Sequence, residues 1–231
     1  RWYRYMVGIC EDKVLTTPCG NRWMVGTVNS FFIGSISTLI ATCLGTLAAL
    51  GLSRPHMPFK GLIMSILISP MIVPLIITAA GMFFFYAKVN LVYTFTGIIL
   101  AHVALSTPFV VITVTATLVG FDTNMTRASQ GLGARPIRTF FKVIMPLILP
   151  GVISGALFAF ITSFDEVVIV MFMASLDQLT IPKQMWAGIR QEISPVILSM
   201  ATCLVALSIF LLTTVELLRR RSERMRGITA R

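Results

Sequence analysis

Charged residues are scarce in this chain. They make up 12% of the 231 residues, and only nine residues are Asp or Glu, whereas about a quarter of the residues in an ordinary soluble domain are charged. Hydrophobic residues make up 56% of the chain, and they occur in long uncharged runs rather than in short stripes. The composition therefore excludes an ordinary soluble domain and indicates a protein that crosses a membrane.

Five apolar runs approach or exceed the roughly 20 residues that a helix needs to cross a bilayer. They are approximately Thr27–Leu52, Leu62–Tyr86, Thr94–Val119, Leu147–Met173 and Val196–Leu218. Membrane β-barrels show short segments of alternating polarity instead, and Val110-Val111-Ile112 is apolar on every face. We predict an all-α integral membrane protein with five transmembrane helices in this chain, forming a single domain over residues 1–231.

Enzyme motifs are also missing from the sequence. There is no Gly-x4-Gly-Lys-Ser/Thr loop for binding nucleotide phosphates. No Ser/His/Asp arrangement, His-rich tract or paired-cysteine metal motif is present, and the methionines are scattered. We therefore expect no catalytic residue, no metal site and no cofactor bound by this chain, and an intramembrane enzyme is disfavoured.

The formal net charge of +10 could by itself indicate nucleic-acid binding, but its distribution indicates a membrane topology. One set of alternate loops holds two acidic residues against twelve basic ones: Arg54, Lys60, Arg127, Arg135, Arg138, Lys142, Arg219, Arg220, Arg221, Arg224, Arg226 and Arg231. The other set holds seven basic residues against four acidic ones. The more basic side should be cytoplasmic. We therefore predict a periplasmic segment over 1–26, a cytoplasmic basic tail over 219–231, and no nucleic-acid partner.

The start of the chain carries two further expectations. The first residue is Arg rather than Met, it falls on the predicted outer side, and no signal-peptide pattern follows it. We therefore expect a membrane helix upstream of residue 1. Cys10 and Cys19 both fall in the outer segment, where an oxidising compartment would allow a disulfide; a bridge and two free thiols both remain open.

Prolines interrupt several of the predicted spans. Pro70 and Pro74 fall in the second, Pro108 in the third and Pro150 in the fourth. A proline inside a helix removes a backbone hydrogen bond and kinks the helix, and membranes tolerate this where neighbouring groups satisfy the freed carbonyls. We therefore expect bent helices, which suit a transporter that changes shape.

The longest predicted cytoplasmic loop, residues 120–146, carries helix signals of its own. Asp122 or the threonine after it can cap a short helix over Thr126–Leu132. Gly133 can end that helix in the left-handed conformation, and a proline suits the first turn of a second short helix over Pro136–Ile144. The loop is predicted to form two short helices that meet at a sharp bend near the membrane surface.

This loop resembles the cytoplasmic loop of permease subunits in binding-protein-dependent importers. Their pattern is Glu-Ala-Ala, three residues, Gly, nine residues, Ile, one residue, Leu-Pro. At the same spacing this chain has Arg127-Ala128-Ser129, Gly133, Val143 and Met145-Pro146. Arg127 replaces the acidic residue of the pattern and Ser129 replaces its second alanine. The spacing is kept throughout.

Other stretches are similar to the spermidine/putrescine permease branch of that family along nearly the whole chain. They are Asn29-Ser30, Pro70 to Pro74, Ala101-His102, Pro108-Phe109, Ser163-Phe164-Asp165-Glu166, Leu179-Thr180-Ile181-Pro182 and Met185-Trp186. Members of the branch carry one more helix before the first residue of this chain. The resemblance therefore implies a six-helix permease core whose first helix is absent here.

The resemblance implies a type I ATP-binding-cassette importer of the bacterial inner (cytoplasmic) membrane. In such an importer two homologous permease subunits form the channel, two ATPase subunits dock on their cytoplasmic loops, and a periplasmic protein delivers the substrate. ATP and Mg²⁺ would bind to the partner ATPase. The residues of this chain that would form the ATPase coupling contact are Arg127, Ala128, Ser129, Gly133, Ala134 and Pro136.

Asp165 and Glu166 stand out because they fall inside a predicted span, with no basic residue within four positions. Ionisable groups at membrane depth are costly and indicate function. We predict that the pair lies on the substrate path, together with Phe164 and Trp186. The alternatives are a structural role at a helix break for the acids and interface anchoring for the tryptophan. His102 is expected to form a hydrogen bond with a neighbouring helix.

The leading functional hypothesis is a permease for a polyamine-like cation, of the spermidine or putrescine type. The same machinery could instead carry ferric iron, a phosphonate or another small solute. A stand-alone channel or a secondary carrier is a different class of transporter, and neither would need an ATPase docking loop. The acidic pair favours a cation but does not decide between these cargoes.

Overall fold

The structure is a computed structural model that describes residues 22–54, 56–191 and 195–225. The described residues form helices and turns without any strand, which confirms the predicted all-α fold. The elements are α2 (Arg22–Leu52), α3 (Lys60–Ile72), α4 (Leu75–Lys88), α5 (Phe95–Val119), α6 (Thr123–Gly131), α7 (Pro136–Thr139), the π-helical turn η1 (Phe140–Ile144), α8 (Met145–Phe164), α9 (Val168–Met173), the 3₁₀ turn η2 (Leu176–Gln178), α10 (Ile181–Gln191) and α11 (Pro195–Met225).

Within the described residues, four helical stretches are long and apolar enough to cross a membrane. They are Arg22–Leu52, Phe95–Val119, Pro136–Phe164 and Pro195–Thr214. The pair α3 and α4 becomes a fifth span only if its two bent halves are taken together. The number of spans is therefore four or five by length and composition.

The second predicted span, Leu62–Tyr86, is wrong as a single helix. It is divided into α3 and α4, whose axes differ by 104°. Val73 is extended, with ψ at 135°, and Pro74 precedes the first turn of α4. The proline ring disfavours helical backbone at the residue before it, and Pro74 supplies no N–H for the preceding helix. Pro70, by contrast, is accommodated inside α3.

The fourth predicted span, Leu147–Met173, has different bounds at both ends. The helix begins at Pro136 and runs through η1 and α8 to Phe164, so the second short helix predicted in the 120–146 loop is the first part of this span. In this widened turn the Met145 N–H bonds to the Phe140 carbonyl, five residues back, and the next residue, Pro146, has no N–H to donate. At the other end the helix stops before Asp165, and α9 is separate.

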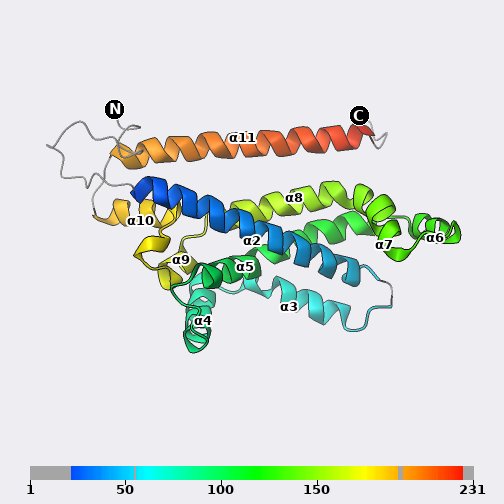
Figure 1. Ribbon diagram of the computed structural model, residues 1–231, viewed down its shortest axis with the longest axis horizontal. Coiled ribbons are helices and arrows are strands. Elements are labelled where there is room, and N and C mark those ends of the chain that lie inside the picture. Colours follow the sequence, from blue (N-terminus) through cyan, green and yellow to red (C-terminus); the bar gives the residue numbers. More distant parts are fainter. Residues whose placement is uncertain (1–21, 55, 192–194, 226–231) are drawn as a thin grey trace.

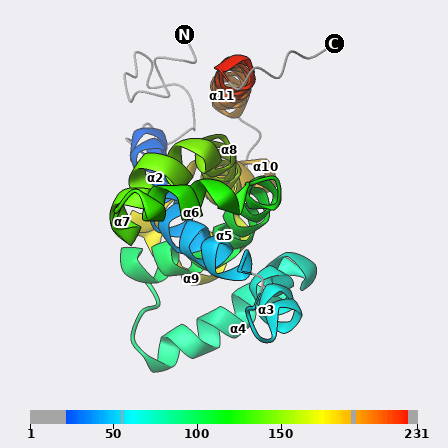
Figure 2. The same ribbon diagram turned by 90° about the vertical axis from the view of Figure 1, so that its right-hand side faces the viewer.

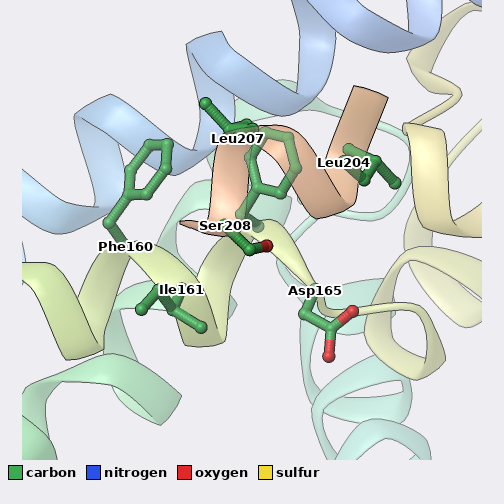
Figure 3. A pocket seen from close by; sticks show the side chains of 7 residues that line it. Phe160, Ile161, Asp165, Leu204, Leu207 and Ser208 are labelled. Carbon is green, nitrogen blue, oxygen red and sulfur yellow. The ribbon is translucent and has the colours of Figure 1, made fainter. Parts of the chain in front are cut away.

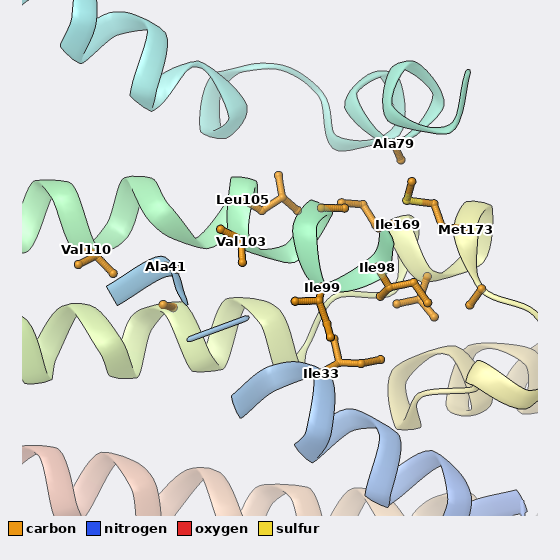
Figure 4. Close-up of a cluster of buried hydrophobic side chains, with 14 of the residues drawn as sticks. Ile33, Ala41, Ala79, Ile98, Ile99, Val103, Leu105, Val110, Ile169 and Met173 are labelled. Atoms are coloured by element: carbon orange, nitrogen blue, oxygen red, sulfur yellow. The ribbon is translucent and has the colours of Figure 1, made fainter. Parts of the chain in front are cut away.

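Helices α2, α5 and α8 pack together as the centre of the molecule, with α11 on one side and α3 and α4 on the other (Figure 2). Their buried side chains join those of α4 and α9 in one apolar cluster, which includes Ile33, Ala41, Ala79, Ile98, Val110 and Ile169 (Figure 4). Small residues let the helices approach closely, as is common between membrane helices. A Cβ at Gly45 would lie 2.6 Å from Val110 Cβ.

The two ends of the molecule are built from different elements (Figure 1). One end carries α6, α7, the connection from α2 to α3, and the C-terminal end of α11. The other end carries α9, α10 and the start of α2. The first end therefore gathers the basic residues from the alternate loops predicted to be cytoplasmic: Arg54, Lys60, Arg127, Arg135, Arg138 and Lys142.

Part of the predicted terminal segments lies in regular helix. Helix α2 begins at Arg22, so the last residues of the predicted outer segment 1–26 belong to it. Helix α11 continues to Met225, so the predicted basic tail 219–231 begins as helix. Cys10 and Cys19 lie outside the described residues, and the disulfide stays a prediction.

The contact between α2 and α5 at Gly45 leads to a stability test. The Gly45→Leu variant should unfold more easily by about 1–3 kcal/mol, because the added atoms overfill a packed helix contact. The measurement is the midpoint of denaturation of the purified protein in mixed micelles. Gly51→Leu in the same helix is the matched control, since a Cβ there has no atom within 4 Å. Equal midpoints for the two variants would contradict this packing.

Candidate functional site

The two acids between α8 and α9 have different surroundings. Asp165 is the C-cap of α8 and is exposed, whereas Glu166 is buried. Glu166 Oε1 accepts a hydrogen bond of 2.8 Å from the Ile169 N–H, one of the donors that the first turn of a helix leaves without an intrahelical partner. At the helix break, the Glu166 carboxylate therefore points inward and caps α9, whereas the Asp165 carboxylate is exposed.

Asp165 lies at one end of a pocket of about 210 Å³ between α8 and α11 (Figure 3). The lining residues are Phe160, Ile161, Phe164, Asp165, Leu204, Leu207 and Ser208. Two of them are aromatic and stack together, with ring centroids 5.5 Å apart. Phe31 of α2 packs edge-on against Phe164 at 5.2 Å. The pocket thus combines an open carboxylate with aromatic walls.

Behind the helix break, a buried hydrogen bond joins α5 to α8. His102 Nδ1 lies 2.7 Å from Ser163 Oγ, and both side chains are buried. This confirms the expectation that His102 bonds to a neighbouring helix. The bond joins the last turn of α8 to α5, two residues before Asp165.

Asn29 and Ser30 hold the segment after α9 against α2, a role that the sequence did not reveal. Asn29 Nδ2 donates to the carbonyls of Asp177 and Leu179 at 3.0 and 2.9 Å. Ser30 Oγ accepts from the Ile181 N–H at 2.9 Å. The signal in the sequence that could have indicated this contact was two adjacent polar side chains at the start of an apolar run. Their partners are about 150 residues further along the chain, so the sequence alone could not identify them.

A half-buried amine completes this end of the molecule. Lys183 Nζ donates to the carbonyls of Val170 and Ala174 at 3.2 and 3.1 Å, at the C-terminal end of α9. A cation at that end of a helix interacts favourably with its last carbonyls. Burial lowers the pKa of Lys183 from its ordinary value.

Trp186 lies one turn further along α10 and is exposed. The guanidinium carbon of Arg190 is 5.5 Å from the centre of its ring, which is within the range of a cation–π contact. Trp186 does not line the pocket beside Asp165. The substrate path that the sequence predicted for Trp186 together with Asp165 and Phe164 stays a prediction.

The 120–135 loop has the predicted bend at Gly133, whose φ is +80°. Asp122 caps α6 by accepting from the Asn124 N–H at 2.9 Å, and Pro136 begins α7. The predicted coupling residues lie together around this bend, at the end of the molecule that carries α6 and α7 (Figure 1). Of these, Arg127, Ala128, Gly133 and Pro136 are exposed, while Ser129 and Ala134 are half-buried.

Within the described residues, no group of three or more His, Cys, Asp and Glu side chains could hold a metal ion. The arrangement is instead that of a membrane bundle with a compact helical loop at one end and a carboxylate-bearing pocket towards the other. The model for the family "Binding-protein-dependent transport system inner membrane component" matches residues 41–224.

The chain belongs to this family. The permease is 30% identical to the spermidine/putrescine transport system permease protein PotC of Haemophilus influenzae, over 85% of this chain and 76% of that protein. It is 29% identical to PotC of Escherichia coli K12, over 83% and 73% of the two chains. The putrescine transport system permease protein PotI of E. coli K12 is 28% identical over 89% and 72%.

Two solved structures share the permease fold. An inward-facing structure of the MetNI methionine ABC transporter matches with a TM-score of 0.69 at 19% identity, covering 90% of this chain and 99% of that chain. A crystal structure of an amino acid ABC transporter with histidines gives a TM-score of 0.63 at 17% identity, over 87% and 94%. At these identities the likeness concerns the fold alone.

Membership of the family confirms the resemblance drawn from the loop spacing. The protein is a multi-pass permease subunit of an ATP-binding-cassette importer of the inner membrane, and it works with other permease, ATPase and binding-protein components. It is a transport subunit rather than an enzyme, because ATP hydrolysis in this family belongs to a separate subunit.

The contact between Asn29 and the segment after α9 can be tested by hydrogen exchange. Asn29→Leu keeps the side-chain size but leaves two carbonyls without their donor, which costs about 1–3 kcal/mol. Backbone amides of residues 174–191 should then exchange faster with deuterium. Thr27→Val is the matched control, since the Thr27 hydroxyl bonds only to Trp23 in its own helix. Unchanged exchange in Asn29→Leu would contradict the contact.

Proposed function

We propose that this permease imports a polyamine-like cation of the spermidine or putrescine type, and that Asp165 meets this cation on its path. The observation that carries the proposal is the position of Asp165, an exposed carboxylate at the edge of an aromatic-lined pocket. The names of the similar permeases PotC and PotI support the same cargo class.

The chemistry of the pocket fits a flexible organic cation. An ammonium group can pair with the Asp165 carboxylate, and the faces of Phe160 and Phe164 attract cations through their ring quadrupoles. The methylene chain between two ammonium groups can lie against Leu204 and Leu207. A phosphonate would be repelled by the carboxylate, and the lining side chains offer ferric iron only the Asp165 carboxylate and the Ser208 hydroxyl as oxygen ligands.

The other predicted path residues take different parts in this proposal. Glu166 acts by holding α9 in place, since one of its oxygens already bonds to the Ile169 N–H. Phe164 belongs to the pocket wall together with Asp165. Trp186 already contacts the Arg190 guanidinium with its ring and is not among the residues that line the pocket, which favours anchoring over contact with the cation.

At the end of the molecule that carries α6 and α7, the coupling residues at the bend are proposed to dock on an ATPase subunit. The exposed side chains of Met125 and Arg127 in α6, and of its C-cap Leu132, form a surface that is partly apolar. Basic residues at this end support a cytoplasmic location for it, which would put the C-terminus in the cytoplasm too. The complete transporter would then hold two permease subunits, two ATPase subunits and a periplasmic binding protein.

The bend itself can be tested at Gly133. A Cβ at this position would have no atom within 4 Å, but φ is +80°. The free-energy cost of adding a side chain therefore comes from the backbone conformation and not from a steric clash with neighbours. Gly133→Val should reduce transport-coupled ATP hydrolysis at least about tenfold, because β-branched residues avoid positive φ. Gly133→Asn should retain most of the activity, because Asn tolerates that conformation.

Gly131→Val is the positional control, since Gly131 has no positive φ and no atom within 4 Å of an added Cβ. The measurement is ATP hydrolysis by the assembled transporter in proteoliposomes, in the presence of binding protein and substrate. Wild-type hydrolysis and transport in Gly133→Val would refute the docking role of this bend.

The cargo is tested by uptake of radiolabelled spermidine and putrescine into the same proteoliposomes. Asp165→Asn should lower uptake about tenfold, because the amide has the size of the carboxylate but no charge to pair with an ammonium group. Asp177→Asn is the control, as an exposed acid of the same type that does not line the pocket. The ATPase should still co-purify with both variants.

The other hypotheses give different results in this assay. Uptake that does not depend on ATP would indicate a channel or a secondary carrier. ATP-dependent uptake of another solute, with no competition by polyamines, would refute the cargo class while keeping the importer. Full polyamine uptake in Asp165→Asn would remove this carboxylate from the path.

A further inference from the structure

A single pair of hydroxyl groups joins the bend of the predicted docking loop to the long helix that comes after it. Ser129 Oγ lies 3.0 Å from Thr139 Oγ1, across ten residues of sequence. Thr139 is 1% exposed, and its N–H bonds to the Arg135 carbonyl in the first turn of α7. The pair is therefore a shielded contact between two helices.

Helix α6 has little else to hold it in this position. It has no fully buried residue whose side chain the structure describes. The bonds after its last turn, such as Ala134 N–H to the Ser129 carbonyl at 3.1 Å, are local to the bend. In the described part of the chain, no other side-chain hydrogen bond joins α6 to α7. The relative position of the two helices thus depends strongly on Ser129 and Thr139.

The long helix beyond Thr139 gives this contact a mechanical consequence. The π-helical turn η1 begins at the next residue, and the helix then runs without a break to Phe164. From Thr139 to Phe164 this is about 37 Å at the usual helical rise. Asp165 comes directly after the far end. A displacement of α6 that is transmitted to Thr139 therefore acts on one end of a continuous helix whose other end carries the carboxylate.

We propose that Thr139 is a positioning residue for coupling, and that its hydroxyl bond with Ser129 transmits movement of α6 into the long helix Pro136–Phe164. This inference rests on the proposed function, because it takes α6 as the part that an ATPase moves. Thr139 lies outside the set of docking residues that the sequence pattern identifies. Ser129 stands where the pattern has alanine, so its hydroxyl is a feature of this chain.

The test measures how much movement arrives at the far end of the helix. A fluorophore is attached to Ile161→Cys, beside Asp165, in a parent protein whose four native cysteines are serine. The permease is assembled with its ATPase in nanodiscs, and the change in emission on addition of ATP is recorded. This measurement needs no knowledge of the cargo.

Ser129→Ala and Thr139→Val should each lower the amplitude of this change about fivefold, the effect expected when one hydrogen bond is lost. The double variant should be no worse than either single variant, because both remove the same contact. Thr139→Ser keeps the hydroxyl and should restore the response. Thr202→Val is the control, since the Thr202 hydroxyl bonds to Leu198 in its own helix.

Three results would overturn the proposal. The first is an unchanged amplitude in Thr139→Val. The second is a double variant whose amplitude falls by the product of the two single effects. The third is loss of the ATPase from the purified complex, which would indicate a role in assembly alone. An ATP response in the parent without polyamine uptake would refute the proposed cargo and leave the test of Thr139 valid.

Discussion

Every backbone amide and carbonyl that lies in hydrocarbon needs a partner within the protein, and the rest of this structure depends on that constraint. It requires helices, and it makes each interruption of a helix costly. The two interruptions inside apolar sequence, at Val73–Pro74 and after Phe164, occur where the chain supplies either a proline or a set of capping side chains. The break at Val73–Pro74 changes the direction of the chain. The break after Phe164 exposes a carboxylate beside an aromatic pocket.

The second interruption shows how the constraint is met by distant parts of the chain. Glu166 accepts from a free N–H at the start of α9, and Lys183 donates to carbonyls at its end. Asn29 provides donors for carbonyls of the segment after α9. Three polar side chains from separate regions thus stabilise one short helix and its surroundings, which leaves Asp165 as the acid of the pair that is open to a ligand.

The same constraint relates the two ends of the permease. Because α7, η1 and α8 form one unbroken helix, a change at the α6 bend and a change near Asp165 involve the same rigid element. Packed helices tend to move as units rather than to deform continuously. A transporter that separates nucleotide binding from substrate handling needs such an element, and here it is a single helix with a widened turn near one end.

The sequence by itself determined the fold class, the membrane location and the family. Long uncharged runs and the Arg127 to Pro146 spacing are local features, and they can be recognised from the order of residues alone. The cap at Asp122 and the bend at Gly133 were also readable locally, since each depends on one residue's conformation. Only the tertiary structure decided that the Glu166 side chain is buried while that of Asp165 is exposed. It also decided that the chain bends by 104° at Pro74, whereas Pro70 does not interrupt its helix. The bond from Asn29 to the Leu179 carbonyl likewise became visible only in three dimensions. Each of these depends on which partner is within hydrogen-bond or packing distance, and the chain brings those partners together from up to 150 residues away.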